Sequence, residues 1–404
     1  MRLLSLLLAL QLAACAAARF PPIGQPEPDY AAAHQFFAEY CALSQIKKRP
    51  GFGADIRGEI GGHAVFYLNG ACRDPADPYP VLILCERGGA GLSMNAHFLN
   101  AKWVATPDHD FFFEGGVAPG TPITQATYRT VQREAHRRGI YAGVTFHDVV
   151  FADMPQGWSR EDWKYEVSVG TDYAIALARG RYCVRIPVDR AAMARMIAFL
   201  NAENVPYRAG KPFDWSILSD NCIHLAHNAL AAAGLWDRWP TNRFVLISMF
   251  DFPVPRNEFV NLARYTNDTI PPDPGAAYDN PVFRRSLLEF GLLPARPGAL
   301  AESRPLLQPN EVYDTDLKLI FYDDPIFGPY QRRFDRIFAE PRYTDPAANR
   351  AAFAAAAQQA LATRTPLIAW LAQPRFGADP AGFAAIYDRY YALMTRLAAP
   401  LAAP

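Results

Sequence analysis

Residues 58–69, GEIGGHAVFYLN, alternate between two sets of side chains and end at a turn. Odd-numbered residues from His63 onward would face one side, and even-numbered residues such as Phe66 would face the other. This alternation predicts a β-strand with His63 at its start, directly after two glycines. A histidine in this position is a candidate general base. The alternative is a strand histidine that is only held by hydrogen bonds.

Working outward from this strand, the sequence predicts an α+β body. The other elements expected before Pro240 are a helix over 30–46, a short strand over 81–86 with a Gly-rich turn at 88–91, a helix over 122–139, a strand over 144–151, a strand over 182–188, a helix around 193–200 and a helix over 221–233. Beyond Pro240 prolines become dense, and Ala-rich helices are expected over 346–372 and 380–398. We therefore predict one domain over 30–240 and an accessory, Pro-rich and helical region over 241–404.

The start of the chain has the features of an export signal. Arg2 precedes the apolar run 3–12, and Ala13 and Ala14 precede Cys15. A short apolar run that ends in small residues is typical of a secretory signal and is too short to span a membrane. Ordinary cleavage after Ala18 is one interpretation. Residues 19–29 contain four prolines and are expected to form a stiff tether.

The same residues also resemble the lipobox of bacterial lipoproteins, in the order Leu12-Ala13-Ala14-Cys15. The resemblance implies that Cys15 is acylated and that residues 1–18 serve as signal and anchor. It places the protein in the bacterial cell envelope, lipid-anchored and facing the periplasm. Ala16 is not the Asp that commonly retains such lipoproteins at the inner membrane, which favours the outer membrane.

Composition excludes several functional classes. Lys and Arg number 40, as do Asp and Glu, and no basic run is present, so a nucleic-acid partner is not expected. The sequence contains no Gly-x-Ser-x-Gly, His-Glu-x-x-His or Cys-x-x-Cys motif, and the glycines at 88–91 lack the dinucleotide fingerprint. The tripeptide Asp108-His109-Asp110 is interpreted as a polar loop. No metal or cofactor is therefore expected.

The segment 219–228, SDNCIHLAHN, contains the candidate nucleophile. Ser219 or Asp220 is a good N-cap, which places Cys222 in the first turn of a helix. Backbone N–H groups and the helix dipole there stabilise a thiolate, the form that attacks carbonyl carbon. The alternative is a cysteine that only packs on one helix face. His224 lies about 200° around the helix from Cys222, so a base should come from another element, and His63 is the best candidate.

The two motifs together resemble circularly permuted papain-like proteins, which include NlpC-type peptidases and lecithin:retinol acyltransferase-like enzymes. Residues 62–68, GHAVFYL, resemble the histidine strand of that group, and residues 221–225, NCIHL, resemble its cysteine helix. The resemblance covers residues 55–235, with the histidine before the cysteine as in permuted members. It implies Cys222 as nucleophile, His63 as base, and Glu86 as the residue that orients the ring, with Asn95 and His97 in reserve because the loop 71–79 is longer here. The Cys222 backbone N–H would stabilise the oxyanion.

Six cysteines bear on the same assignment. Without Cys15 their number is odd, so in an oxidising compartment at least one cysteine is left without a disulfide partner and keeps its thiol. If this is Cys222, the other four form up to two disulfides with three possible pairings, or stay reduced; they are Cys41, Cys72, Cys85 and Cys183.

We therefore expect a cell-envelope thiol hydrolase or acyltransferase that acts on an amide or ester through a thioester. A peptidoglycan peptide is favoured over a lipid as substrate. The alternative is a non-catalytic envelope lipoprotein that binds a peptide or lipid or serves as a scaffold. Trp158, Trp163 and Tyr165 are expected either to line a substrate groove or to pack in the core.

Overall fold

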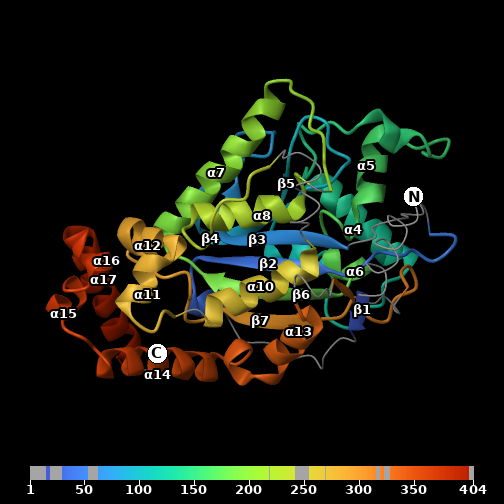
Figure 1. Ribbon diagram of the computed structural model, residues 1–404. Coiled ribbons are helices and arrows are strands. Elements are labelled where there is room, and N and C mark those ends of the chain that lie inside the picture. Colours follow the sequence, from blue (N-terminus) through green and yellow to red (C-terminus); the bar gives the residue numbers. More distant parts are fainter. Residues whose placement is uncertain are drawn as a thin grey trace, which may run out of the picture.

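The computed structural model describes residues 30–52, 62–217, 219–241, 254–268, 270–314 and 328–399, and the backbone of 15–18 and 319–322 (Figure 1). The apolar run before Cys15 and the predicted tether lie outside the described residues. In the described part of the chain, no helix is long and apolar enough to cross a membrane.

An antiparallel sheet of six strands forms the centre of the molecule, in the order β5-β4-β3-β2-β6-β7. Its strands are β2 (Phe37–Leu43), β3 (His63–Arg73), β4 (Leu82–Ser93), β5 (Val104–Pro107), β6 (Arg181–Pro187) and β7 (Leu300–Arg304). A separate pair joins β1 (Cys15–Ala18) to β8 (Leu319–Tyr322). The α+β class and the strand that begins at His63 are confirmed.

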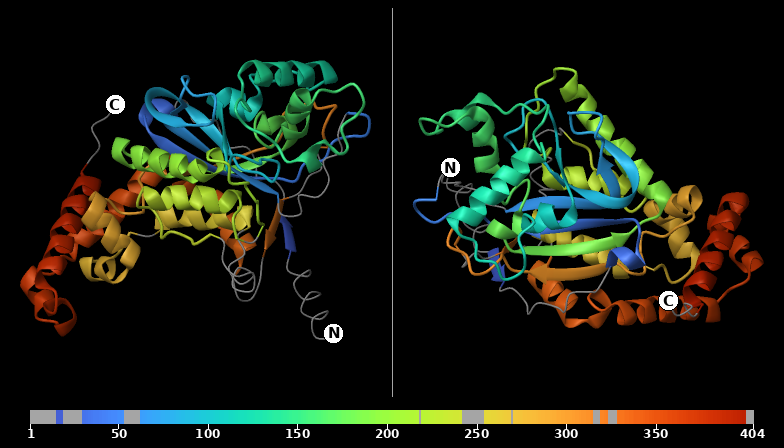
Figure 2. Two further views of the ribbon diagram at one scale, coloured as in Figure 1. Left: turned by 90° about the horizontal axis from the view of Figure 1, so that it is seen from above. Right: turned by 180° about the vertical axis from the view of Figure 1, so that it is seen from behind.

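Helices cover both faces of the sheet. One face carries α7 (Arg190–Arg208), α8 (Cys222–Ala232) and α10 (Pro255–Asp268), which lie in front of the sheet in Figure 1. The other carries α3 (His109–Glu114), α4 (Gln125–Arg137), α5 (Arg160–Ser168) and α6 (Ile175–Ala178), seen on the opposite side of the strands in Figure 2. Tyr67 contacts the ring of Phe112 in α3, whereas Tyr40, on β2, donates to the Pro255 carbonyl of α10. Successive side chains of a strand point to opposite faces of the sheet, so Tyr67 packs against one helix layer and Tyr40 against the other.

Three sequence predictions for this body were wrong. The helix expected over 30–46 is only one turn, α2 (Tyr30–Ala33), and then becomes β2, whose seven residues are all buried. A strand buried on both faces shows no alternation, so its apolar run resembles a helix. The strand expected over 144–151 is instead a bridge at Phe146 and a 3-10 turn, η1 (Asp148–Phe151).

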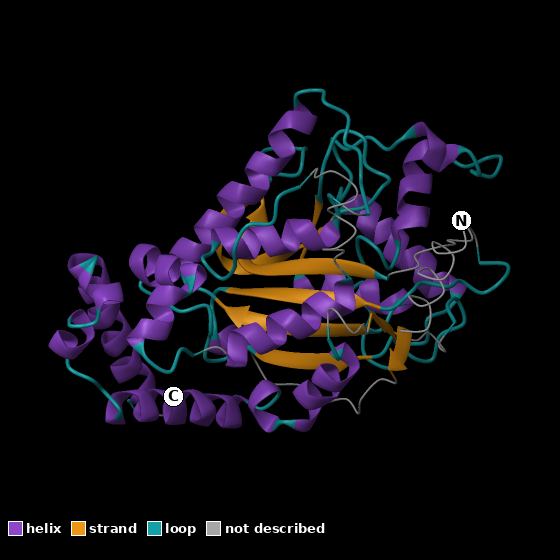
Figure 3. Cartoon of the chain, in the orientation of Figure 1, coloured by secondary structure: helices purple, strands orange, loops and turns teal. Residues whose placement is uncertain are grey.

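The Gly-rich turn expected at 88–91 is also wrong, because β4 runs through these glycines. The strands of the sheet are drawn in orange in Figure 3. A Cβ at Gly91 would meet the Phe112 ring at 2.1 Å. The glycine therefore allows α3 to pack closely on the strand, which is a known reason for glycine within a strand.

Residues beyond Pro240 take part in both the sheet and a second cluster. The segment from α10 to β7 belongs to the sheet, since β7 pairs with β6, so the predicted division at 240 does not coincide with an edge of the sheet. The Ala-rich helices, at the lower left in Figure 1, pack around a second apolar core. The remaining elements are α11 (Pro274–Asp279), α12 (Pro281–Arg285), η2 (Ser286–Phe290), α13 (Tyr330–Ala339), η3 (Pro341–Tyr343), α14 (Pro346–Ala362), α15 (Leu367–Leu371), α16 (Pro374–Gly377) and α17 (Pro380–Ala398).

Two disulfides connect neighbouring strands. Cys41 of β2 is bonded to Cys183 of β6, and Cys72 of β3 is bonded to Cys85 of β4. This is one of the three pairings that the sequence allowed. Among the described side chains, the cysteine outside both bridges is Cys222.

Candidate functional site

Cys222 is the first residue of α8, and the residues around it explain why the helix starts there. Asn221 is the N-cap, and its Oδ1 accepts from the backbone N–H of Ile223 at 2.9 Å and of His224 at 3.3 Å. In return Nδ1 of His224 lies 3.4 Å from the Asn221 N–H, which completes a capping box. The motif Asn-Cys-x-His thus uses its Asn and His to fix the helix start. Cys222, which is partly buried, is left at the positive end of the helix dipole.

A buried ion pair holds the segment that leads into α8. Nζ of Lys102 lies 2.9 Å from Asp220 and 2.6 Å from Glu203. Lys102 comes two residues before Val104, which is paired with Ser93 of β4. Ser93 is in turn near the end of β4 that lies beside the start of β3. The start of α8 and the start of β3 therefore lie at the same end of the sheet.

His63, at the start of β3, is buried against a serine of the neighbouring strand. Its Nε2 lies 3.2 Å from Oγ of Ser93. Ser93 Oγ lies 2.6 Å from Oδ1 of Asp172 and 3.1 Å from the Thr171 carbonyl. Three side chains from distant parts of the chain are thus connected in the order His63, Ser93, Asp172.

Asp172 is fully buried between α5 and α6 and is surrounded by donors. Asn95 Nδ2 donates to it at 2.7 Å, and the Tyr141 hydroxyl donates at 2.8 Å. Burial raises the pKa of Asp172 to about 6, and the hydrogen bonds from Ser93, Tyr141 and Asn95 act against that rise. The carboxylate therefore titrates near neutral pH rather than in the usual acidic range of an Asp.

The two candidate catalytic side chains belong to different faces of the sheet. His63 is paired with Leu43 and alternates with Val65 and Tyr67, which face α3. Cys222 packs on the face that carries α8 and α10. It contributes, after burial and Glu258, to raising the pKa of Tyr40 on that face. The structure therefore does not bring the ring and the thiol together on one face of the sheet.

Gly62 directly precedes β3 and is packed against an arginine of the C-terminal half. Its φ is +73°, and a Cβ at this position would lie 2.0 Å from Nη2 of Arg256. Arg256 is fully buried in α10. The guanidinium therefore lies directly against the backbone that leads into His63, and glycine is required both for the conformation and for the contact.

Glu86, which was expected to orient the His63 ring, instead contacts Gln35 and Arg190. It is exposed, accepts from Gln35 at 2.7 Å, and is 3.2 Å from Arg190. Along β4 it is seven residues, or about 23 Å of strand, from Ser93. Of the reserves, Asn95 joins the network through Asp172, and the His97 backbone N–H donates to Asn95.

Sequence reasoning missed Ser93 and Asp172. Ser93 was hidden because β4 was expected to end before the glycines. Asp172 did carry a signal, since it is the one acidic residue in the apolar stretch 167–178, VSVGTDYAIALA. A single carboxylate in such a stretch is expected to be buried and bonded.

The tripeptide at 108–110 serves the fold. Asp108 caps α3, and Nε2 of His109 lies 3.0 Å from Oε2 of the fully buried Glu39. Burial alone would raise the pKa of Glu39, but Arg185, His109 and Arg181 together lower it to about 2. Within the described residues, the group that could hold a metal ion is Glu39 with Cys41 and Cys183. Those two cysteines form a disulfide, so they offer no thiolate to a metal.

Comparison with known proteins adds no family to this geometry: no protein-family model, no curated protein and no solved structure matches the chain.

Proposed function

We propose that this protein is a thiol-dependent hydrolase or acyltransferase of the bacterial cell envelope, built on a permuted papain-like domain, with Cys222 as nucleophile and His63 as general base. The observation that carries the proposal is the position of Cys222. The one cysteine that the disulfides leave over, among the described side chains, stands at a capped helix N-terminus. His63 begins its strand at the same end of the sheet.

The hydrogen bonds of Ser93 suggest which nitrogen of His63 acts. A hydroxyl has one proton, and the short contact with Asp172 takes it. Ser93 Oγ then accepts from Nε2–H of His63, so the lone pair is on Nδ1. In the proposed reaction the ring of His63 takes the proton of the Cys222 thiol, and this requires the two side chains, which belong to different faces of the sheet, to meet beyond the start of β3. Ser93 and Asp172 position the ring and stabilise its charged form.

The proposed reaction is acyl transfer in two steps. The Cys222 thiolate attacks the carbonyl carbon of an amide or ester, and the oxyanion is stabilised by the backbone N–H of Cys222. When the tetrahedral intermediate collapses, the C–N or C–O bond breaks, and the amine or alcohol leaves with the proton from His63. Water or another hydroxyl or amine then attacks the thioester, its proton passes to His63, and the thiol is restored.

The proposed compartment is the outer side of a membrane, with the protein attached through acylated Cys15. Two disulfides between neighbouring strands support it, because such bonds persist in oxidising compartments. An envelope location makes a peptidoglycan peptide the proposed substrate ahead of a lipid acyl group. Release of peptide or acyl products from envelope fractions, followed by mass, separates the two.

The reactivity of the Cys222 thiol tests the proposal. Full-length protein is alkylated with iodoacetamide from pH 5 to pH 9, and the rate at Cys222 is followed by peptide mass. We expect alkylation at pH 6 to be at least tenfold faster than that of the same thiol in urea, since attack requires the thiolate. His63→Ala should abolish this advantage, whereas His136→Ala, which changes an exposed histidine of α4, should retain it. Equal rates for native and unfolded protein would exclude an activated thiol.

A further inference from the structure

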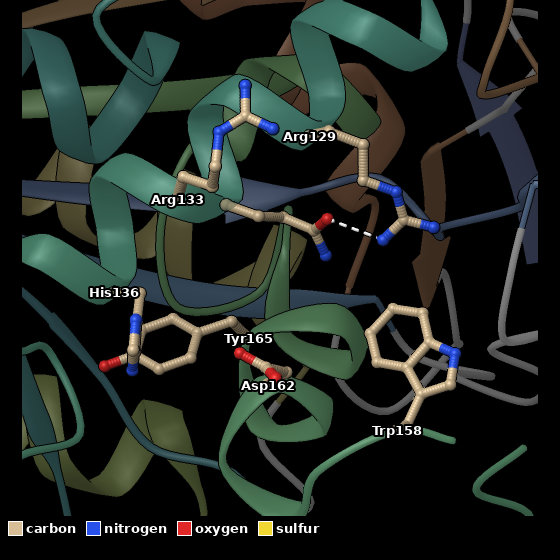
Figure 4. Close-up of a pocket in the computed structure, with 7 residues that line it drawn as sticks. Arg129, Arg133, His136, Trp158, Asp162 and Tyr165 are labelled. Carbon is tan, nitrogen blue, oxygen red and sulfur yellow. Dashed lines mark hydrogen bonds between the residues drawn. The ribbon is translucent and has the colours of Figure 1, made fainter. Parts of the chain in front are cut away.

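A second polar site lies between α4 and α5, away from Cys222. Arg129, Arg133 and His136 line one wall of a groove, and Trp158, Asp162 and Tyr165 line the other (Figure 4). The three basic residues follow the spacing i, i+4, i+7 and so share one face of α4. The sequence expectation for the aromatic residues is met in part. Trp158 and Tyr165 line this groove, whereas Trp163 is buried and donates to the Val150 carbonyl.

Arg129 is held in place before any ligand binds. Its Nη1 donates to Gln132 and to Glu166, both at 2.8 Å. Its guanidinium also lies 5.1 Å from the centre of the Trp158 ring. Within the described part of the chain, the hydrogen bonds of Arg129 all use Nη1. The N–H groups on Nε and Nη2 can therefore donate to a ligand. A pre-organised arginine loses little conformational entropy when it binds an anion.

The charges around the groove do not cancel. The buried Glu166 is shared by Arg129 and by Lys48, whose Nζ lies 2.7 Å from Oε1. That group of three therefore has one positive charge in excess. Arg133 is exposed, and in the described residues it bonds only to the Thr130 hydroxyl. The single acid in the wall, Asp162, accepts from Ser159 at 2.6 Å.

We propose that this groove binds a phosphate group of a phosphate ester. Arginines match phosphate through paired N–H donors, and Arg129 and Arg133 both belong to the α4 wall of the groove. The Trp158 ring supplies an apolar surface for the carbon skeleton of the ester. The site is independent of the proposed thiol chemistry, and its phosphate could come from a lipid headgroup or from a soluble ester.

Calorimetric titration of the full-length protein tests the site. The probes are inorganic phosphate, glycerol 3-phosphate and dihexanoylphosphatidylglycerol below its micelle concentration, with glycerol as the neutral control. We expect saturable binding of at least one phosphate probe, and none of glycerol. Arg133→Gln should weaken that binding at least tenfold. The matched control is Arg137→Gln, one turn further along α4, where the arginine is ion-paired with Glu134.

The probes also distinguish the sources of the phosphate. Binding of dihexanoylphosphatidylglycerol well above that of glycerol 3-phosphate, lost in Trp158→Ala, supports a lipid headgroup. Similar binding of the two esters supports a soluble ester. The proposal is overturned if no phosphate probe binds, or if Arg133→Gln and Arg137→Gln bind as the unchanged protein does.

Discussion

The Ser93 hydroxyl lies 3.2 Å from Nε2 of His63 on the neighbouring strand and 2.6 Å from a carboxylate oxygen of Asp172. Both contacts are buried, and the acceptor is a carboxylate, so the Ser93 proton is held by Asp172. The contact with Ser93 orients the ring of His63, and the proposed arrangement of donors places the ring proton on Nε2. The network would have the same geometry in a binding protein. The network has a catalytic role only if changing it alters the reactivity of the Cys222 thiol.

Replacing Ser93 by Ala removes the group that orients the ring. Losing one net hydrogen bond of about 1 kcal/mol corresponds to a change of about fivefold in rate. We expect Cys222 alkylation at pH 7 to be slower by about this factor, with a shifted pH profile and an unchanged unfolding midpoint within a few degrees. Ser219→Ala is the control, because Ser219 is nearer to Cys222 in sequence but bonds to Ser216. If both variants are alkylated as fast as the unchanged protein, the Ser93 network does not affect the reactivity of Cys222.

Asp172→Asn should change how stability depends on pH. Burial raises the folded-state pKa of Asp172 from 3.8 to about 6. Between these values the folded protein keeps a proton that the unfolded chain has released, so stability from this group falls as pH rises and is lowest above about pH 6. A shift of about two pH units corresponds to about 3 kcal/mol.

Urea unfolding from pH 4 to pH 7 measures this effect. The free energy of unfolding of the unchanged protein, minus that of Asp172→Asn, should fall by about 2.4 kcal/mol over this range, since the rest of the change lies below pH 4. Asp162→Asn, at an exposed carboxylate, should show no such trend. A difference that stays constant with pH would mean that Asp172 titrates as an ordinary Asp.

The sequence predicted the fold best where side chains alternate or follow a helical period. β3 was recognised from its alternation although helices cover both of its faces, and α4 and α8 were recognised from their helical period. β2 was misjudged because all seven of its residues are buried, and such a run cannot be distinguished by its pattern from a buried helix. The role of Gly91 depends on a contact with Phe112, and no local pattern reveals such a contact.

The candidate site was predictable only in part, for a related reason. Cys222 was placed correctly in the first turn of a helix, although the cap was expected at Ser219 or Asp220 and the structure has it at Asn221. The network that orients His63 has no local sequence signal, since Ser93 and Asp172 are separated by 79 residues in sequence. Arg256 lies still further along the chain, in a part that was expected to be accessory. Its position against Gly62 follows from how α10 packs on the sheet.

Gly62→Ala tests that packing directly. The added Cβ would lie 2.0 Å from a guanidinium nitrogen of Arg256, which is fully buried and can move only if its surroundings repack. Gly120→Ala is a matched control: Gly120 has a similar φ, +79° against +73°, but nothing lies within 4 Å of its Cβ position. Both variants lose about 1 kcal/mol from the left-handed backbone, and Gly62→Ala should lose about 1–3 kcal/mol more from overpacking. Urea unfolding of the two variants gives this difference. Equal losses would mean that Arg256 moves away freely, and the start of β3 would then be held by its own strand pairing and not by the C-terminal half of the chain.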